Sequence, residues 1–156
     1  MSTLRIMRGY PASGKTTLAR LWVNEDPDGR ARVNRDDLRA SMYDKAGVLT
    51  FTQEQTISKV QRAQVRVLLR AGVDVVVDDT NLRLKFAQAW VDLAAQCGAQ
   101  VEVVDVRTDV DECVRRDMSR GLRGGREVGA SVIRGIAAKF PVAAWPELMS
   151  AMGVAS

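Results

Sequence analysis

Histidine is absent from this chain of 156 residues, and only two cysteines are present. The absence of histidine excludes histidine-based zinc sites and histidine-based acid–base catalysis. Any general base is therefore expected to be a carboxylate or another unusual group. Cys97 and Cys113 fall at apolar positions of helical patterns, and no Cys-Xaa-Xaa-Cys spacing occurs. We interpret both as buried, reduced thiols rather than as a disulfide.

Long apolar runs are also missing. None reaches the ~18 residues that a membrane span needs, and the N-terminus does not join a basic segment to a long apolar one. Aromatic residues make up 5% of the chain, against 46% hydrophobic and 27% charged residues, a composition typical of a soluble globular protein. We therefore expect one cytoplasmic domain over residues 1–156, with one active site and no membrane partner.

Lysine is scarce relative to arginine, which supplies most of the positive charge behind the net charge of +4. Planar guanidinium groups suit bidentate binding of phosphate. The charge pattern therefore favours acidic or phosphate-bearing partners.

Short strand-like segments alternate with helical patterns along the first two thirds of the chain. The strand-like segments are Leu4–Met7, Ala31–Val33, Val73–Val77 and Val101–Val106. This order predicts an α/β protein with an open parallel sheet of about four strands, flanked by helices and joined by right-handed crossovers. Val73–Val77 is apolar and β-branched enough to lie in the middle of the sheet. Ligands of such sheets bind outside the carboxyl ends of the strands.

The helical patterns predict which side chains face the core. The first helix is expected to bury Leu18, Leu21 and Trp22. A later helix is expected to begin at a capping box of Thr52 and Gln55. Its buried stripe is expected to comprise Ile57, Val60, Val67 and Leu68.

A glycine-bearing loop follows the first predicted strand and runs into the first predicted helix. Its sequence is Gly9-Tyr10-Pro11-Ala12-Ser13-Gly14-Lys15-Thr16. Glycines at both ends let backbone N–H groups converge on phosphate, Lys15 reaches the outer phosphates, and Thr16 offers a hydroxyl to Mg²⁺. The alternative, a glycine turn with a surface lysine, is disfavoured by the flanking strand and helix. The residues predicted to bind ATP or a related triphosphate are Gly9, Pro11, Ala12, Ser13, Gly14, Lys15, Thr16 and Thr17.

Pairs of aspartates follow the second and third predicted strands. Asp36 and Asp37 could cap a helix; in a kinase without histidine, a carboxylate here could instead take the proton of the acceptor. Asp78 and Asp79 occupy the place of a Walker B carboxylate, which helps to hold Mg²⁺. A strand-terminal Asx turn is the structural alternative. Thr16 and Asp78 are taken as candidate metal ligands, and the residues alone leave open which of Asp78 and Asp79 serves the metal.

An arginine-rich segment follows the last predicted strand. Arg116 and Arg120 lie four residues apart, so they share one face of a helix, and glycines follow at once. Arginines beside glycines are typical of a lid that closes over a triphosphate. The alternative is a solvated basic face. We predict an arginine-rich helical lid over about residues 115–130, with Arg116 and Arg120 binding the nucleotide.

Four motifs together resemble the kinase domain of the bacteriophage 5′-polynucleotide kinases, over roughly residues 1–140. They are the glycine-bearing loop, Asn34-Arg35-Asp36-Asp37-Leu38-Arg39, Asp79-Thr80-Asn81-Leu82 and Arg116-Asp117-Met118-Ser119-Arg120-Gly121. The resemblance implies a P-loop kinase fold. It also implies that Lys15 and Thr16 bind the phosphates and Mg²⁺, that Asp36 is the general base for a 5′-hydroxyl and that Arg39 contacts the acceptor nucleotide. Asp79, Thr80 and Asn81 would shape the acceptor pocket, Arg120 would contact the donor phosphates as a catalytic residue, and Arg116 would be a lid arginine.

The activity implied by the resemblance is transfer of the ATP γ-phosphate to the 5′-hydroxyl end of DNA or RNA, as in nucleic acid repair. Family members often carry a phosphatase domain with an Asp-Xaa-Asp-Gly-Thr motif, which this sequence lacks. We therefore expect kinase activity alone. Two alternatives remain: a kinase for a small molecule, since related folds serve many acceptors, and a nucleotide-gated binding module.

Overall fold

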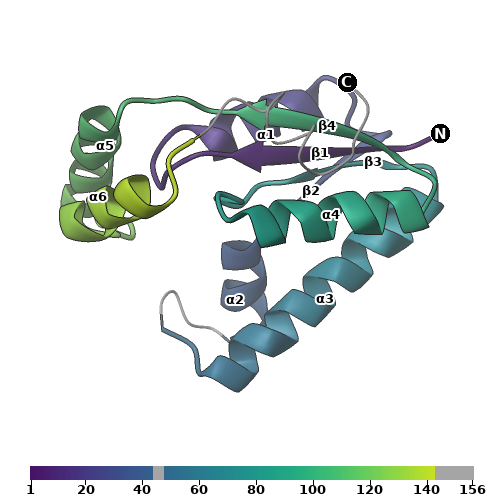
Figure 1. Cartoon of the computed structure of the whole chain (residues 1–156), viewed down its shortest axis with the longest axis horizontal. Coiled ribbons are helices and arrows are strands. Elements are labelled where there is room, and N and C mark those ends of the chain that lie inside the picture. Colours follow the sequence, from purple (N-terminus) through teal and green to yellow (C-terminus); the bar gives the residue numbers. More distant parts are fainter. Residues whose placement is uncertain (44–47, 143–156) are drawn as a thin grey trace.

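The computed structural model describes residues 1–43 and 48–142 (Figure 1). Its centre is a parallel sheet of four strands in the order β2-β3-β1-β4. The strands are β1 (Thr3–Arg8), β2 (Arg30–Val33), β3 (Asp74–Val77) and β4 (Gln100–Asp105). The predicted open parallel sheet of about four strands is therefore confirmed.

Strand β3 lies inside the sheet, between β2 and β1, as its apolar sequence predicts. Leu4 of β1 pairs with Val75, and Val33 of β2 pairs with Val77. Val75, Val76 and Val77 are all fully buried. Because helices cover both faces of a central parallel strand, side chains on both of its faces are buried, and successive positions are apolar instead of alternating with polar residues.

Six helices complete the described part of the chain. They are α1 (Lys15–Asn24), α2 (Arg35–Tyr43), α3 (Phe51–Arg70), α4 (Leu84–Gln96), α5 (Val110–Leu122) and α6 (Ala130–Lys139). Helices α3 and α4 pack on one face of the sheet and α1 packs on the other (Figure 1). Helices α5 and α6 pair with each other beyond one end of the sheet, around Cys113, Val114 and Ile133. None of the described helices is both long and apolar enough to cross a membrane.

The buried face of α1 differs from the prediction. Trp22 is buried as expected, but Leu18 and Leu21 are 46% and 56% exposed, and Ala19 is buried in their place. The helix begins at Lys15, whose side chain is itself buried. Positions 15, 19 and 22 then form one stripe at helical spacing, which turns Leu18 and Leu21 toward solvent.

The capping box of α3 lies two residues earlier than predicted. The Thr50 hydroxyl accepts a hydrogen bond from the Gln53 N–H at 3.2 Å, and the Gln53 side chain accepts one from the Thr50 N–H at 2.9 Å. Thr50/Gln53 and Thr52/Gln55 have the same spacing, and the earlier pair lengthens the hydrogen-bonded helix. Val67, expected in the buried stripe, is 67% exposed, because Val65 and Leu69 face the sheet.

Candidate active site

The loop between β1 and α1 has a backbone that strongly restricts its sequence. Ala12 and Gly14 adopt positive φ angles of 61° and 101°. A Cβ added at Gly9 would lie 2.7 Å from the Ser13 hydroxyl oxygen and 3.0 Å from the Val106 carbonyl oxygen, so only glycine fits there. Left-handed residues of this kind build the nests in which successive N–H groups face an anion. The loop therefore has the backbone of a phosphate cradle.

Lys15 is folded back onto this loop and is only 8% exposed. Its Nζ donates to the Tyr10 carbonyl at 2.7 Å and lies 3.4 Å from the Ser13 hydroxyl oxygen. Burial lowers the pKa of Lys15 to about 8, although the nearby carboxylates of Asp78 and Asp79 act in the opposite direction. The ammonium group is thus held within the loop, where an incoming anion would meet it.

The two aspartates after β3 have different surroundings. The Asp79 carboxylate accepts the Arg35 N–H at 3.0 Å and the Gln61 side-chain amide at 2.5 Å, so it ties β3 to the start of α2 and to α3. One oxygen of Asp78, Oδ2, accepts from Arg32 at 2.7 Å. The other, Oδ1, is buried and has no hydrogen-bond partner among the described residues. Asp78 is therefore the carboxylate with an oxygen left for a ligand.

Burial raises the pKa of both carboxyl groups. For Asp78 the effect is opposed by the Thr16 hydroxyl, the Arg32 guanidinium and the Lys15 ammonium. A divalent cation at Asp78 would favour the charged carboxylate in the same way.

The start of α2 is capped by residues other than Asp36. The Asn34 side-chain oxygen accepts the Asp37 N–H at 3.1 Å, and Asp79 accepts the Arg35 N–H. Asp37 pairs with Arg32 and does not line the cavity described below. Asn34 and Asp79 thus cap the helix, the role that was one interpretation of Asp36. The Asp36 side chain is left available for another role.

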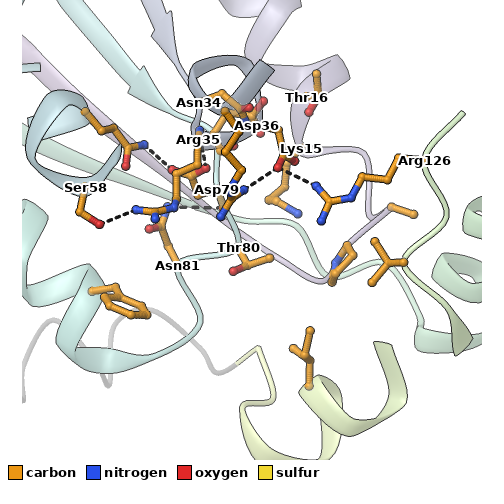
Figure 2. Close-up of a pocket in the computed structure, with 18 of the residues that line it drawn as sticks. Lys15, Thr16, Asn34, Arg35, Asp36, Ser58, Asp79, Thr80, Asn81 and Arg126 are labelled. Carbon is orange, nitrogen blue, oxygen red and sulfur yellow. Dashed lines mark hydrogen bonds and ion pairs between the residues drawn. The ribbon is translucent and has the colours of Figure 1, made fainter. Parts of the chain in front are cut away.

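Asp36 lies between two arginines (Figure 2). Its Oδ1 accepts from Nη1 of Arg39 at 2.6 Å and from Nη1 of Arg126 at 2.7 Å. Its Oδ2 has no partner in residues 1–43 and 48–142, and the side chain is 58% exposed. The carboxylate is therefore oriented through one oxygen and open at the other.

Arg39 is held from its other side by α3. Its Nε and Nη2 donate to the Glu54 carboxylate at 2.9 and 3.0 Å, and Arg35 donates to the same carboxylate at 2.6 Å. The hydrogen bonds from Arg39 are the main reason that the pKa of Glu54 lies below its ordinary value. This ion-pair network fixes α2 against α3 and so fixes the position of Asp36.

The predicted lid corresponds to the end of α5, the following loop and the start of α6. Arg116 donates to the Ser13 carbonyl at 3.3 Å, in the loop between β1 and α1, here called the P-loop. Arg120 donates to Asp117 at 2.7 Å, and the same buried carboxylate accepts the N–H groups of Val128 and Gly129. Asp117 therefore joins both ends of the loop that carries Arg126.

Two cavities meet at the carboxyl end of the sheet. The smaller, of about 430 Å³, is lined by Ala12, Ser13, Gly14, Lys15, Thr16, Thr17, Arg116, Arg120 and Arg123. The larger, of about 780 Å³, is lined by residues of α2, α3, α4 and α6, including Asp36 and Arg39. Ala12, Lys15, Thr16 and Arg120 line both. A group bound in the P-loop cavity would therefore face the cavity that contains Asp36.

The structure thus brings together nearly all the predicted site residues. Pro11, Asp78, Asp79 and Thr80 line the larger cavity, and so does Asn81. However, the Asn81 amide donates to the Met7 carbonyl at 2.9 Å and accepts from Trp90 Nε1 at 3.1 Å. Its polar atoms therefore support the cavity wall rather than project from it.

Several residues of the site were missed by the sequence analysis. Glu54, Gln61 and Asp117 position the predicted residues, and Arg126 contacts Asp36 across 90 positions of sequence. The Gly124-Gly125-Arg126 sequence was a possible signal for a loop arginine, but it does not specify which carboxylate the arginine meets.

Comparison with known proteins identifies the family of this domain. Residues 4–143 match a family described as the AAA domain. The chain belongs to this AAA domain family. Among solved structures, a chain of the Pnkp1/Rnl/Hen1 RNA repair complex superposes on this domain with a TM-score of 0.81 and 29% identity, over 89% of this chain and 44% of that chain. The Mycobacterium tuberculosis APS kinase CysC, in complex with AMPPNP and APS, has a TM-score of 0.62 at 19% identity, over 80% of this chain and 73% of that chain, which shows the fold alone.

Curated relatives are longer proteins that match this AAA domain over part of their length. A predicted bifunctional polynucleotide kinase/RNA ligase of Autographa californica nuclear polyhedrosis virus is 29% identical, over 59% of this chain and 14% of that protein. The 2′,3′-cyclic-nucleotide 3′-phosphodiesterase of Rattus norvegicus is 32% identical, over 68% of this chain and 24% of that protein. The chain thus spans about a quarter or less of these relatives. The predicted P-loop kinase fold is confirmed.

Proposed function

We propose that this AAA domain transfers the γ-phosphate of ATP to the 5′-hydroxyl end of DNA or RNA. The observation that carries the proposal is the wall shared by the two cavities, because Lys15, Thr16 and Arg120 would face both a donor and an acceptor. Phosphoryl transfer depends mainly on such positioning and on stabilisation of charge. The likeness to a polynucleotide kinase/RNA ligase and to an RNA repair complex supports a nucleic acid acceptor.

The smaller cavity is the proposed donor site. The P-loop backbone would bind the phosphates, Lys15 would reach the outer ones, and Arg116 and Arg120 would approach from the lid. Mg²⁺ would be held by Thr16 and Asp78, and the buried Oδ1 of Asp78 fits this role because it lacks a hydrogen-bond partner among the described residues. Mg²⁺ is commonly held by one or two carboxylates together with substrate phosphates. When bound, it neutralises charge on the β- and γ-phosphate oxygens.

The larger cavity is the proposed acceptor site. The Oδ2 of Asp36, which has no partner among the described residues, would accept the proton of the 5′-hydroxyl while Arg39 and Arg126 hold Oδ1. Arg39 would bind an acceptor phosphate. Phe86 and Val132 line the same cavity and are 46% and 48% exposed, so they offer an apolar wall to a nucleoside.

Incubation with γ-labelled ATP, Mg²⁺ and 5′-hydroxyl oligonucleotides, beside a panel of small alcohols, tests the proposal. Label at the 5′ end of the oligonucleotide is expected. Label on small alcohols alone would indicate a small-molecule kinase. Nucleotide-dependent protein binding without transfer would indicate a binding module.

Arg39→Ala should raise KM for the oligonucleotide by about 10- to 100-fold while leaving ATP binding unchanged, because a charge-assisted contact to an acceptor phosphate is lost. Steady-state kinetics in each substrate measures this. The matched control is Glu54→Gln, which weakens the network around Arg39 but keeps the guanidinium. An equal KM defect in Glu54→Gln would show that Arg39 acts by fixing α2 and not by binding the acceptor.

The affinity for ATP should fall as the pH rises through about 8, the pKa of Lys15 in the free protein. Below this pH the ammonium is charged and ready for the triphosphate. Above it, binding must take up a proton, so Kd should rise by up to about tenfold per pH unit. Titrations between about pH 7.5 and 9.5 measure the effect. A Lys15→Arg variant that retains binding should lose the dependence, since its guanidinium does not titrate there; a flat wild-type profile would contradict the assignment.

A further inference from the structure

Helix α3 carries four cations along one face, Lys59, Arg62, Arg66 and Arg70, here called the α3 cation row; Arg66 is half-buried and the other three are exposed. Their spacings of three and four residues place them within a narrow arc of the helix. No acidic residue occurs between Gln55 and Arg70. At 1.5 Å per residue the row is about 16 Å long.

The row has no internal partners in the described part of the chain. No salt bridge involves any of its members, whereas Arg35, Arg39 and most arginines outside α3 form at least one. Like charges four residues apart, as in Arg62, Arg66 and Arg70, destabilise a helix. Arg70 lies in the last turn, where a cation favours the helix dipole, but helix stability does not account for Lys59, Arg62 and Arg66, whereas an external polyanion would.

The row is continuous with the proposed acceptor site. Arg62 lines the larger cavity together with Ser58 and Gln61 of the same helix. From there α3 runs along the face of the sheet, away from α2 and toward the opposite end of the strands (Figure 1). The row thus borders the cavity that contains Asp36 at Arg62, and Arg66 and Arg70 lead away from it.

We propose that the α3 cation row binds successive backbone phosphates of the acceptor strand beyond its 5′-terminal nucleotide. This inference rests on the proposed function and adds the path by which the strand leaves the active site. Backbone phosphates are contacted without regard to sequence, and each neutralised phosphate adds to the salt dependence of binding. The domain should therefore prefer oligonucleotides of several residues to a nucleoside 3′-monophosphate, and the row should account for that preference.

The test compares wild-type protein with Arg66→Gln/Arg70→Gln, two positions outside both cavities. KM for an oligonucleotide of about 12 residues should rise roughly three- to thirtyfold. The slope of log KM against log salt concentration should fall by about 1.4, or 0.7 for each lost contact with a single strand. KM and kcat for a nucleoside 3′-monophosphate should stay unchanged, because that acceptor does not reach the row.

The matched control is Arg20→Gln, which removes an exposed arginine of α1 that also has no ion pair among the described residues. It should change neither KM nor the salt slope. If the double variant and the control behave alike, or if both acceptors lose equally, the inference is overturned. Should wild-type protein phosphorylate no acceptor, anisotropy with a 5′-hydroxyl oligonucleotide separates the two ideas. If the wild-type protein binds the oligonucleotide and the double variant binds it more weakly, the α3 cation row is a nucleic acid-binding surface and the proposed kinase activity is wrong. If no such binding is seen, both proposals are wrong.

Discussion

Arg120→Ala should lower the rate of phosphoryl transfer by about 10³- to 10⁵-fold, the range for an arginine that meets transition-state charge. Arg120 lines both cavities, so its guanidinium lies where the transferring phosphoryl group would pass. Its bond to the buried Asp117 holds the side chain at that boundary. Single-turnover experiments with saturating γ-labelled ATP and a 5′-hydroxyl oligonucleotide measure the transfer rate separately from binding.

Arg123→Ala is the matched control for Arg120. Arg123 belongs to the same arginine-rich segment but lines only the smaller cavity, and no ion pair holds it in the described structure. Its loss should weaken ATP binding at most mildly and leave the transfer rate within a few fold of wild type. Equal, mild losses at Arg120 and Arg123 would mean that the lid is only a solvated basic face.

Local signals explain why the fold and the nucleotide loop could be predicted. The P-loop depends on Gly9 and Gly14 at a fixed spacing, and the structure gives both positions a geometric reason for glycine. The place of Val75 inside the sheet follows from a short apolar, β-branched segment. Because the carboxyl ends of parallel strands share one edge, Asp36 and Asp79 could be expected near Lys15 before any contact was known.

Features that depend on distant residues could not be predicted. The different surroundings of the Asp78 and Asp79 carboxylates are set by Arg32, Arg35 and Gln61, which lie 18 to 46 positions away along the chain. The contact between Arg126 and Asp36 requires the lid loop to meet α2, which no local pattern specifies.

The predicted buried face of α1 was wrong for a related reason. The prediction assigned Lys15 to the phosphate-binding loop and left it out of the buried stripe of the helix, whereas α1 begins at Lys15 and the side chain of Lys15 is buried. The burial of that one charged side chain moves the buried stripe of the helix away from two leucines.

Asp36→Asn should keep the fold and both substrate affinities while lowering the transfer rate by about 10²- to 10⁴-fold. Asn34 and Asp79, not Asp36, cap α2, so the substitution removes no cap. The amide oxygen of asparagine can still accept from Arg39 and Arg126, but the group cannot take the proton of a 5′-hydroxyl. Rapid-quench measurement of the transfer step, with Kd for each substrate determined separately, distinguishes a lost base from lost binding.

Asp37→Asn is a close control, because Asp37 lies in the same first turn of α2 and is similarly exposed. Both substitutions remove one negative charge from the helix N-terminus, so any effect through the helix dipole should be similar. Asp37 pairs with Arg32 and does not line the cavity, so its variant should transfer phosphate at close to the wild-type rate. If Asp36→Asn keeps wild-type turnover, or if Asp37→Asn shows the larger loss, Asp36 is not the general base. The proposed donor site would stand in either case, since Lys15, Thr16 and Arg120 line its cavity and Asp36 does not.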